Sequence, residues 1–399
     1  MIPEGMQDIL PAEVAQLRGI EAAVRERFAA YGYEEVRLPI LEFAETFERL
    51  EDDTLEAGYR VFGEHGRQLM LRTDLTVGVV RMAESRYRDK PLPLRFSYLA
   101  SACRPWAPQR SQDGEFVQAG VELLGDDSAA ADAEVVTLLC DVLASLGLRE
   151  HRVVIGTMAF SAALVESFGI GDDDEQALLD ALHDRDYPLL ETILDNVGVD
   201  DEARRALQQT VDVSGAREVL AHARRLSRTA SMEQTVGRLE TVRDLVAAAG
   251  YEGALAFDLG LFQDLAYYTG IVLEAYAPGV GLPIATGGRY DGLGAHFEWD
   301  VPGVGVALSV DRLRLALEEA GVALAALAPP LQFVGGLELP EQAAELRQGG
   351  LAVAALPAAG RPAAGPVLRH ERGRYELEPL DGAPVSGSWR DVLQALGLR

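Results

Sequence analysis

Three tyrosines and a glycine pair stand out as residues that could line a binding site. Tyr267 and Tyr268 precede an apolar, β-branched run, and Tyr290 follows the pair Gly287–Gly288. Tyrosine rings offer flat walls with polar tips, and glycines let a backbone approach a ligand closely. A turn cluster at 278–281 separates the two segments. The stretch therefore predicts a strand, a loop and a second strand that together form one wall of a small-molecule pocket.

Four other polar side chains could supply hydrogen-bonding groups to such a pocket. Asp74 and Thr76 lie where an apolar helical pattern begins, and Gln118 and Glu122 are four apart in an alternating segment, hence on one face of a strand. Each pair also has a purely structural explanation. Asp74 could cap the helix, and Gln118 and Glu122 could face solvent on an edge strand.

The charge balance limits the classes of partner. The chain has 63 acidic and 36 basic residues and a formal charge of −27. Such a field opposes binding to polyanions unless a local basic patch compensates, and the sequence offers no such patch. We therefore expect no tRNA partner. No segment is apolar enough to cross a bilayer and no secretory signal is visible, so we expect a cytoplasmic protein without membrane contact.

Metal, cofactor and lysine chemistry are not expected. Cys103 and Cys140 are the only cysteines, the six histidines are scattered without metal-ligand spacing, and Lys90 is the only lysine. A thiolate zinc site, a phosphate-binding P-loop lysine and a lysine Schiff base are thereby disfavoured.

The hydrophobic patterns predict an α+β protein with two or three domains, because 399 residues exceed one ordinary core. We expect one large domain over residues 1–325 and a small α/β domain over 329–399. Between 171 and 250 the pattern predicts helices only, as an inserted module. The expected elements of the large domain are a helix at 12–31, a strand at 35–41 stopped by Pro39, a hairpin at 60–71, two antiparallel strands within 95–125, a helix at 128–146, strands at 152–156 and 271–275, and a strand running into a helix at 301–313.

Two segments resemble the signatures of histidyl-tRNA synthetases. They are Tyr267-Tyr268-Thr269-Gly270 and the segment from Gly287 to Leu293, Gly-Gly-Arg-Tyr-Asp-Gly-Leu. The resemblance implies a class II aminoacyl-tRNA synthetase-like antiparallel sheet flanked by helices. It further implies a histidine pocket formed by Asp74, Thr76, Gln118, Glu122, Tyr267, Tyr268 and Tyr290.

Three further segments resemble the class II motifs. The helix, glycine, strand and proline of residues 12–39 resemble motif 1, which builds the dimer interface in that family. Arg104 matches the motif 2 arginine that grips the α-phosphate, and Arg312 matches the motif 3 arginine that holds the γ-phosphate. We therefore expect Arg104 and Arg312 to be residual phosphate-site arginines.

The departures from the synthetase pattern concern activation chemistry. The first signature normally carries an arginine, a glycine and an aspartate where this chain has Gln263, Asp264 and Ala266, and Trp106 replaces the glutamate that reads adenine. Aminoacylation brings a carboxylate against a phosphate, so losing a guanidinium there removes charge that the reaction needs. In motif 3, Ser309 replaces a glycine and Asp311 a glutamate. The sequence predicts histidine binding without activation.

The chain keeps the histidine-binding signatures but lacks catalytic cations, and this combination resembles one known group of proteins. Residues 1 to about 320 are similar to the regulatory subunits of two-component ATP phosphoribosyltransferases, non-catalytic paralogues of histidyl-tRNA synthetase. The resemblance implies a role in histidine biosynthesis, a short catalytic subunit as partner, histidine as feedback effector, and a homodimer within a hetero-oligomer. Two alternatives remain open, namely a divergent histidyl-tRNA synthetase and a stand-alone histidine-binding paralogue.

Overall fold

The chain forms two units, Met1–Leu324 and Ala325–Arg399, according to the contacts between its residues. The structure is a computed structural model that describes residues 2–50, 58–63, 66–105, 114–183, 186–211, 214–261, 267–324, 328–362, 365–380 and 383–398.

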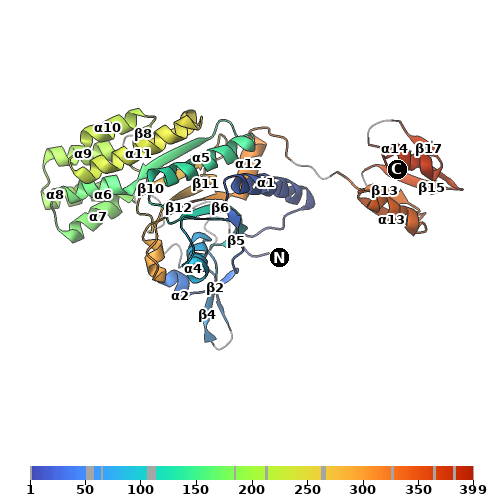
Figure 1. Ribbon diagram of the computed structural model, residues 1–399, viewed down its shortest axis with the longest axis horizontal. Coiled ribbons are helices and arrows are strands. Elements are labelled where there is room, and N and C mark those ends of the chain that lie inside the picture. The colour runs from blue at the N-terminus through green and yellow to red at the C-terminus, as the bar shows by residue number, and fades with distance from the viewer. Residues whose placement is uncertain are drawn as a thin grey trace. The chain divides into compact units, whose positions relative to one another are not determined.

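A nine-stranded sheet forms the centre of the first unit (Figure 1). Its six middle strands are antiparallel neighbours, in the order β5 (Leu94–Cys103), β6 (Glu115–Leu124), β12 (Gly303–Ser309), β11 (Ala285–Arg289), β10 (Ile271–Tyr276) and β7 (Arg152–Thr157). The edges are mixed: β1 (Glu34–Glu35) pairs parallel with β5, β9 (Leu255–Asp258) pairs parallel with β7, and β8 (Ser214–Gly215) pairs antiparallel with β9. The expected α+β class, with helices flanking a largely antiparallel sheet, is confirmed.

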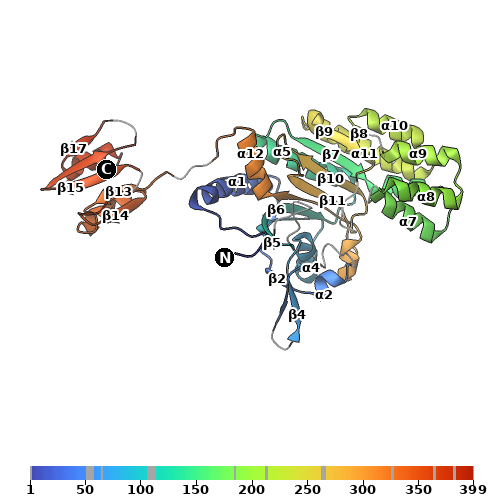
Figure 2. The same cartoon turned by 180° about the vertical axis from the view of Figure 1, so that it is seen from behind.

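One face of this sheet carries α1 (Pro11–Ala30), α5 (Ala129–Ser145) and α12 (Val310–Glu319), as both views show (Figures 1 and 2). Proline suits the first turn of α1, where its missing N–H is not needed, and Gly32 just after the helix has a φ of +81°. Four apolar side chains of α1 recur at three- and four-residue spacing and are buried in the core on this face: Leu17, Ile20, Val24 and Phe28.

The opposite face carries α4 (Thr76–Tyr87), the 3₁₀ turn η4 (Leu293–Phe297) and the short helix α2 (Glu45–Glu48). A second core lies there, and it includes Phe96 and Tyr98 of β5. Successive side chains of β6 point to opposite faces of the sheet. Ala119, Val121 and Leu123 point into the first core. Gln118 and Glu122 therefore face the side of α4.

A three-stranded sheet adjoins this second core, in the order β2 (Leu41–Phe43), β4 (Gln68–Leu71) and β3 (Arg60–Phe62). The predicted hairpin at 60–71 is confirmed by the antiparallel β3 and β4. The expected continuous strand at 35–41 is wrong, because only residues 34–35 and 41–43 are in strands. The interruption has a physical cause: the guanidinium of Arg72 binds the carbonyls of Leu38 and Pro39, and proline has no N–H to offer a ladder.

Helices dominate the region from 158 to 250. They are α6 (Met158–Glu166), α7 (Asp172–His183), α8 (Tyr187–Val197), α9 (Asp201–Val211), α10 (Glu218–Leu226) and α11 (Ala230–Ala248). The expectation of helices only misses the two-residue strand β8, which is too short to leave a periodic pattern. Buried residues of α11, including Val236 and Leu239, belong to the first core, so this helix is part of the main packing of the unit.

The second unit holds a five-stranded sheet in the order β14 (Val353–Leu356), β13 (Leu331–Val334), β15 (Val367–Glu371), β16 (Arg374–Glu378) and β17 (Val385–Gly387). Its helices are α13 (Pro340–Gln348) and α14 (Trp389–Ala395), and its core stacks Phe333 against Trp389. Within the described residues of both units, no helix is long and apolar enough to span a bilayer.

Candidate functional site

Glu122 lies at the centre of a buried group of hydroxyls on the α4 side of the sheet. Its Oε1 accepts hydrogen bonds from Oγ1 of Thr76, at 2.7 Å, and from the hydroxyl of Tyr98, at 3.3 Å. Its Oε2 accepts a hydrogen bond from the hydroxyl of Tyr290. Only 1% of Glu122 is exposed. We call Thr76, Tyr98, Glu122 and Tyr290 the Glu122 cluster.

Glycines on the strands make room for this cluster. Gly120 is paired with Tyr98 across β6 and β5, and a Cβ atom at Gly120 would lie 2.3 Å from the Tyr98 hydroxyl. A Cβ atom at Gly303 would lie 2.3 Å from the Tyr290 ring. Real Cβ atoms do not approach other atoms so closely, so the glycines are required for these rings to lie flat over the sheet.

Burial governs the protonation of the two carboxyl groups here. It raises the pKa of Glu122 to about 8, the hydrogen bonds from Thr76 and Tyr290 lower that pKa in part, and the charge of Asp74 raises it. Burial likewise raises the pKa of Asp74, against the opposing effect of the Arg104 charge. Glu122 is therefore mostly protonated at neutral pH, and a cationic ligand beside it would favour its carboxylate form.

Asp74 has a structural role as well as a position in the site. Its Oδ1 accepts a hydrogen bond from the N–H of Val77, at 3.1 Å, in the first turn of α4. The structure therefore contains the helix-capping contact that the sequence suggested for Asp74. The residue is also 4% exposed and lies close enough to Glu122 to affect its pKa, so one side chain both stabilises α4 and adds a second carboxyl group to the site.

Tyr267 and Tyr268 form a wall beside the cluster. Their ring centroids are 4.8 Å apart, and the Tyr267 centroid lies 5.9 Å from that of Tyr290 in an edge-on arrangement. The Tyr268 ring lies over Gly288, where a Cβ atom would come within 2.8 Å of it. The structure thus brings together the tyrosines and one of the glycines that the sequence singled out.

Arg289, between Gly288 and Tyr290, points away from the cluster. Its guanidinium binds Asp132 of α5, at 2.6 Å, and Asp291, at 2.8 Å, and only 2% of the residue is exposed. Asp132 also binds Arg238 of α11, at 2.5 Å. This ion network attaches the segment before Tyr290 to two helices and so holds that tyrosine in place.

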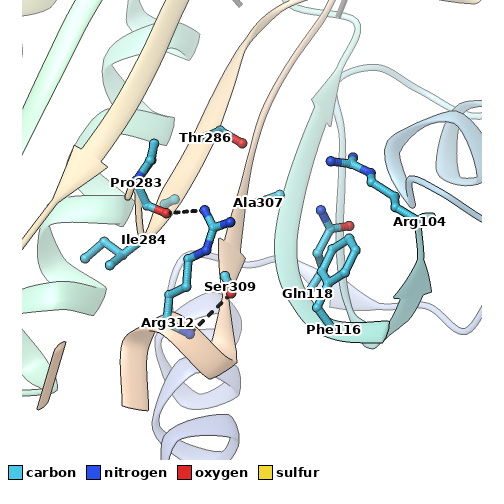
Figure 3. A pocket seen from close by; sticks show the side chains of 10 residues that line it. Arg104, Phe116, Gln118, Pro283, Ile284, Thr286, Ala307, Ser309 and Arg312 are labelled. Atoms are coloured by element: carbon cyan, nitrogen blue, oxygen red, sulfur yellow. Dashed lines mark hydrogen bonds between the residues drawn. The ribbon is translucent and has the colours of Figure 1, made fainter. Parts of the chain in front are cut away.

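Gln118 borders a neighbouring cavity of about 130 Å³ between β6, β11, β12 and α12 (Figure 3). Figure 3 shows Arg104 and Arg312 on opposite sides of this cavity, with the amide of Gln118 beside Arg104. Nε of Arg104 donates to the carbonyl of Thr73, at 2.9 Å, and Nη1 of Arg312 donates to the carbonyl of Pro283, at 2.8 Å. Oε1 of Gln118 is buried with no hydrogen-bond partner among the described residues.

The alternative that Gln118 and Glu122 are solvent-facing residues of an edge strand is wrong. β6 lies between β5 and β12, and Gln118 and Glu122 are 8% and 1% exposed. An isolated alternating pattern does not reveal how many neighbours a strand has, which is why the sequence left this open.

Several sequence predictions concern residues whose structure is not described. Trp106, Gln263, Asp264 and Ala266 all lie outside the described residues. Ser309 and Asp311 are described: Oγ of Ser309 accepts a hydrogen bond from N–H of Arg312, and a carboxylate oxygen of Asp311 accepts one from N–H of Val117, at 2.9 Å. Both therefore fix the start of α12 against the sheet.

Sequence reasoning missed two residues of the site and its support. The sequence placed Tyr98 only in an alternating strand. The available signal was a glycine, Gly120, opposite Tyr98 on the neighbouring strand. Asp132 left no signal, because a carboxylate in the first turn of a helix is ordinary. Among the described residues no group of three or more histidine, cysteine, aspartate and glutamate side chains could hold a metal ion. The site offers hydrogen-bond acceptors and aromatic walls, which suit a small polar ligand with N–H donors.

Comparison with known proteins agrees with this geometry. A family model described as histidyl-tRNA synthetase matches residues 5–313. The chain is 37% identical over 356 residues to the "ATP phosphoribosyltransferase regulatory subunit" of Moorella thermoacetica, covering 88% of this chain and 91% of that protein. It is 33% identical over 320 residues to the protein of the same name in Ruminiclostridium cellulolyticum, covering 80% and 76%.

Solved structures give the same result for the fold. A Bacillus halodurans protein described as an ATP phosphoribosyltransferase regulatory subunit/histidyl-tRNA synthetase superposes with a TM-score of 0.81 at 27% identity, covering 91% of this chain and 94% of that one. Histidyl-tRNA synthetase from Nostoc superposes with a TM-score of 0.78 over 100% of this chain and 98% of that one, but at 19% identity it supports the fold alone. Fold and site define a class II, histidyl-tRNA synthetase-like protein. Within that class, the chain belongs to the family of ATP phosphoribosyltransferase regulatory subunits.

Proposed function

We propose that this chain is a non-catalytic, histidine-binding regulatory subunit that acts in the cytoplasm, where it activates a short catalytic ATP phosphoribosyltransferase subunit and carries feedback inhibition by histidine. The observation that carries the proposal is the Glu122 cluster: a buried carboxyl group, three hydroxyl donors and adjacent tyrosine walls form a site for a small ligand, within a chain whose relatives bear the regulatory-subunit name.

Histidine fits this site by its chemistry. Its imidazole can exchange a hydrogen bond with Glu122, its ammonium can bind Asp74 with Thr76 near, and its ring can lie against Tyr267 or Tyr268. Gln118, at 8% exposure, lies on the same face of β6 and can reach the polar end of the same ligand. Gln263 stands where an activating synthetase has an arginine, so we infer that amino-acid activation is lost.

Two measurements test the proposal. Calorimetric titration of the purified chain with histidine should give saturable binding, and the same chain should give no histidine-dependent exchange of pyrophosphate into ATP. Mixing it with a short catalytic phosphoribosyltransferase subunit should raise that subunit's activity and make it sensitive to histidine. Robust formation of histidyl-adenylate would contradict the proposal.

A homodimer within the hetero-oligomer is supported by exposed apolar side chains. Leu41 and Phe43 of β2 and Val61 of β3 lie on one face of the β2–β4–β3 sheet, because they pair with Leu71 and Leu69 of β4, and they are 40%, 42% and 39% exposed. Several large apolar side chains together on a small sheet favour burial in an interface. Sedimentation analysis should find a dimer, and Val61→Asp should weaken it.

A divergent histidyl-tRNA synthetase is the second candidate, favoured by one observation. Arg104 and Arg312 border the same cavity, as two phosphate-binding arginines would. Rescue of a cell depleted of its histidyl-tRNA synthetase would support this candidate, whereas failure of rescue by a well-expressed chain would favour the regulatory role. A stand-alone histidine-binding paralogue would bind histidine but leave every short catalytic subunit unchanged.

A further inference from the structure

We propose that a cavity at one end of the nine-stranded sheet binds a guanidinium or ammonium group. The cavity has a volume of about 430 Å³ and lies where α5 and α12 end, where β7 begins and beside the turn that follows β10. None of the described residues that line it belongs to the Glu122 cluster or borders the cavity between Arg104 and Arg312. The inference therefore goes beyond the proposed function and does not depend on it.

His151 supplies this cavity with a hydrogen-bond acceptor. The residue lines the cavity and is only 5% exposed. Its Nδ1 lies 2.6 Å from the carbonyl oxygen of Leu148, so Nδ1 carries the proton and Nε2 carries the lone pair. Burial lowers the pKa of His151, which keeps the imidazole neutral. Nε2 is buried without a hydrogen-bond partner among the described residues, and a donor on a ligand would satisfy it.

Carboxylates and helix ends make the cavity favourable for a positive charge. Glu150 and Glu319 line it, and neither forms an ion pair within the part of the chain that the structure describes. Both α5 and α12 end beside the cavity, and the carbonyl groups at the end of a helix carry partial negative charge. Arg149 also lines the cavity, but it is a single exposed cation against two carboxylates. A ligand that is both positively charged and an N–H donor suits these groups best.

The turn at Pro278 and Gly279 fixes the position of one carboxylate. Gly279 has a φ of +82°, and a Cβ atom there would lie 2.9 Å from Cβ and 3.2 Å from Oε2 of Glu319. A side chain at this position would displace Glu319, so the glycine is what lets the turn pack against it. A planar guanidinium has five donors and an ammonium has three, and either can donate to an imidazole and a carboxylate at the same time.

The experiment uses agmatine, which carries a guanidinium and an ammonium group, titrated by calorimetry into the full-length chain. Agmatine should saturate one site, and its affinity should fall by about tenfold or more in Glu319→Gln and in His151→Leu, the range for hydrogen bonds to charged groups. Glu318→Gln is the matched control and should keep the wild-type affinity, because Glu318 pairs with Arg314 instead, at 2.6 Å. Repeating the titration with histidine present removes any agmatine bound at the Glu122 cluster.

A second arm identifies the source of the positive group. In a complex reconstituted with a short catalytic phosphoribosyltransferase subunit, agmatine that still binds would indicate a free small cation. Exclusion of agmatine, together with weaker assembly of Glu319→Gln, would indicate an arginine or lysine side chain of that subunit.

Two results would refute the inference. One is the absence of a saturable agmatine site in the wild-type chain. The other is equal agmatine affinity in the wild type and in Glu319→Gln, whose exposed position leaves folding intact even where His151→Leu does not fold.

Discussion

Gly305 lies directly against the carboxyl group of Glu122. The two residues are paired across β12 and β6, and a Cβ atom at Gly305 would lie 1.8 Å from Oε2 of Glu122. The missing side chain is what allows the Glu122 side chain to lie over the neighbouring strand and reach its hydroxyl donors. The absence of a side chain at Gly305 on β12 thus decides where the carboxyl group of Glu122 on β6 can lie.

Gly305→Ala should therefore displace Glu122 and damage the site. We expect a loss of about 1 to 3 kcal/mol in the free energy of unfolding, as for other overpacked sites. Histidine affinity should fall with it, measured by calorimetry. Gly281→Ala is the control, because nothing lies within 4 Å of a Cβ atom there. Equal histidine affinity in both variants would mean that Glu122 does not contribute to the site.

Feedback should depend on the tyrosine wall and on Glu122, but assembly should not. In a reconstituted complex, Tyr268→Ala or Glu122→Ala should raise the histidine concentration needed for half-inhibition by about tenfold or more, equivalent to about 1.4 kcal/mol of binding. Size-exclusion chromatography should still show the complex. Tyr187→Ala, at a tyrosine 46% exposed on α8, is the control. Unchanged inhibition in both site variants would place the effector site elsewhere.

Stability should fall as the pH rises through the range in which Glu122 titrates. Its folded pKa of about 8 exceeds its ordinary value of 4.5, so between these values the folded chain keeps a proton that the unfolded chain releases. The resulting stabilisation is complete below pH 4.5 and is lost toward pH 8, at up to about 1.4 kcal/mol per pH unit. Glu122→Gln, neutral at every pH, should flatten this slope in denaturation experiments. A slope unaffected by Glu122→Gln would contradict the assignment.

Breaking the ion network behind Tyr290 should cost far more than breaking a surface ion pair. Asp132→Asn would leave the 2% exposed Arg289 without its main partner, and we expect a loss of about 3 to 5 kcal/mol in the free energy of unfolding. Asp244→Asn, which breaks an exposed pair with Arg243, should cost less than about 1 kcal/mol. Similar losses for the two variants in urea denaturation would show that the buried network adds nothing.

Local patterns were sufficient to predict most elements that carry the site. The alternation of residues 95–125, the glycine-rich strand at 303–309 and the apolar spacing of α1 and α5 each follow from the periodicity of one buried face. The strands β15 and β17 of the second unit were not predicted, because β15 mixes charged with apolar residues and β17 has only three residues. The strand expected at 35–41 was interrupted by Arg72, a residue more than thirty positions away.

The sequence by itself determined which chemical groups are present: acidic and amide side chains, tyrosines, glycines and a glutamine in place of an arginine. Only the tertiary structure decided which of them meet. Thr76 of α4, Tyr98 of β5 and Tyr290, just after β11, share one carboxyl group. Arg289 lies next to Tyr290 in the chain yet binds a helix on the other face. The physical reason is that periodicity reports which face of an element is buried, whereas strand order and close packing between elements decide what that face touches.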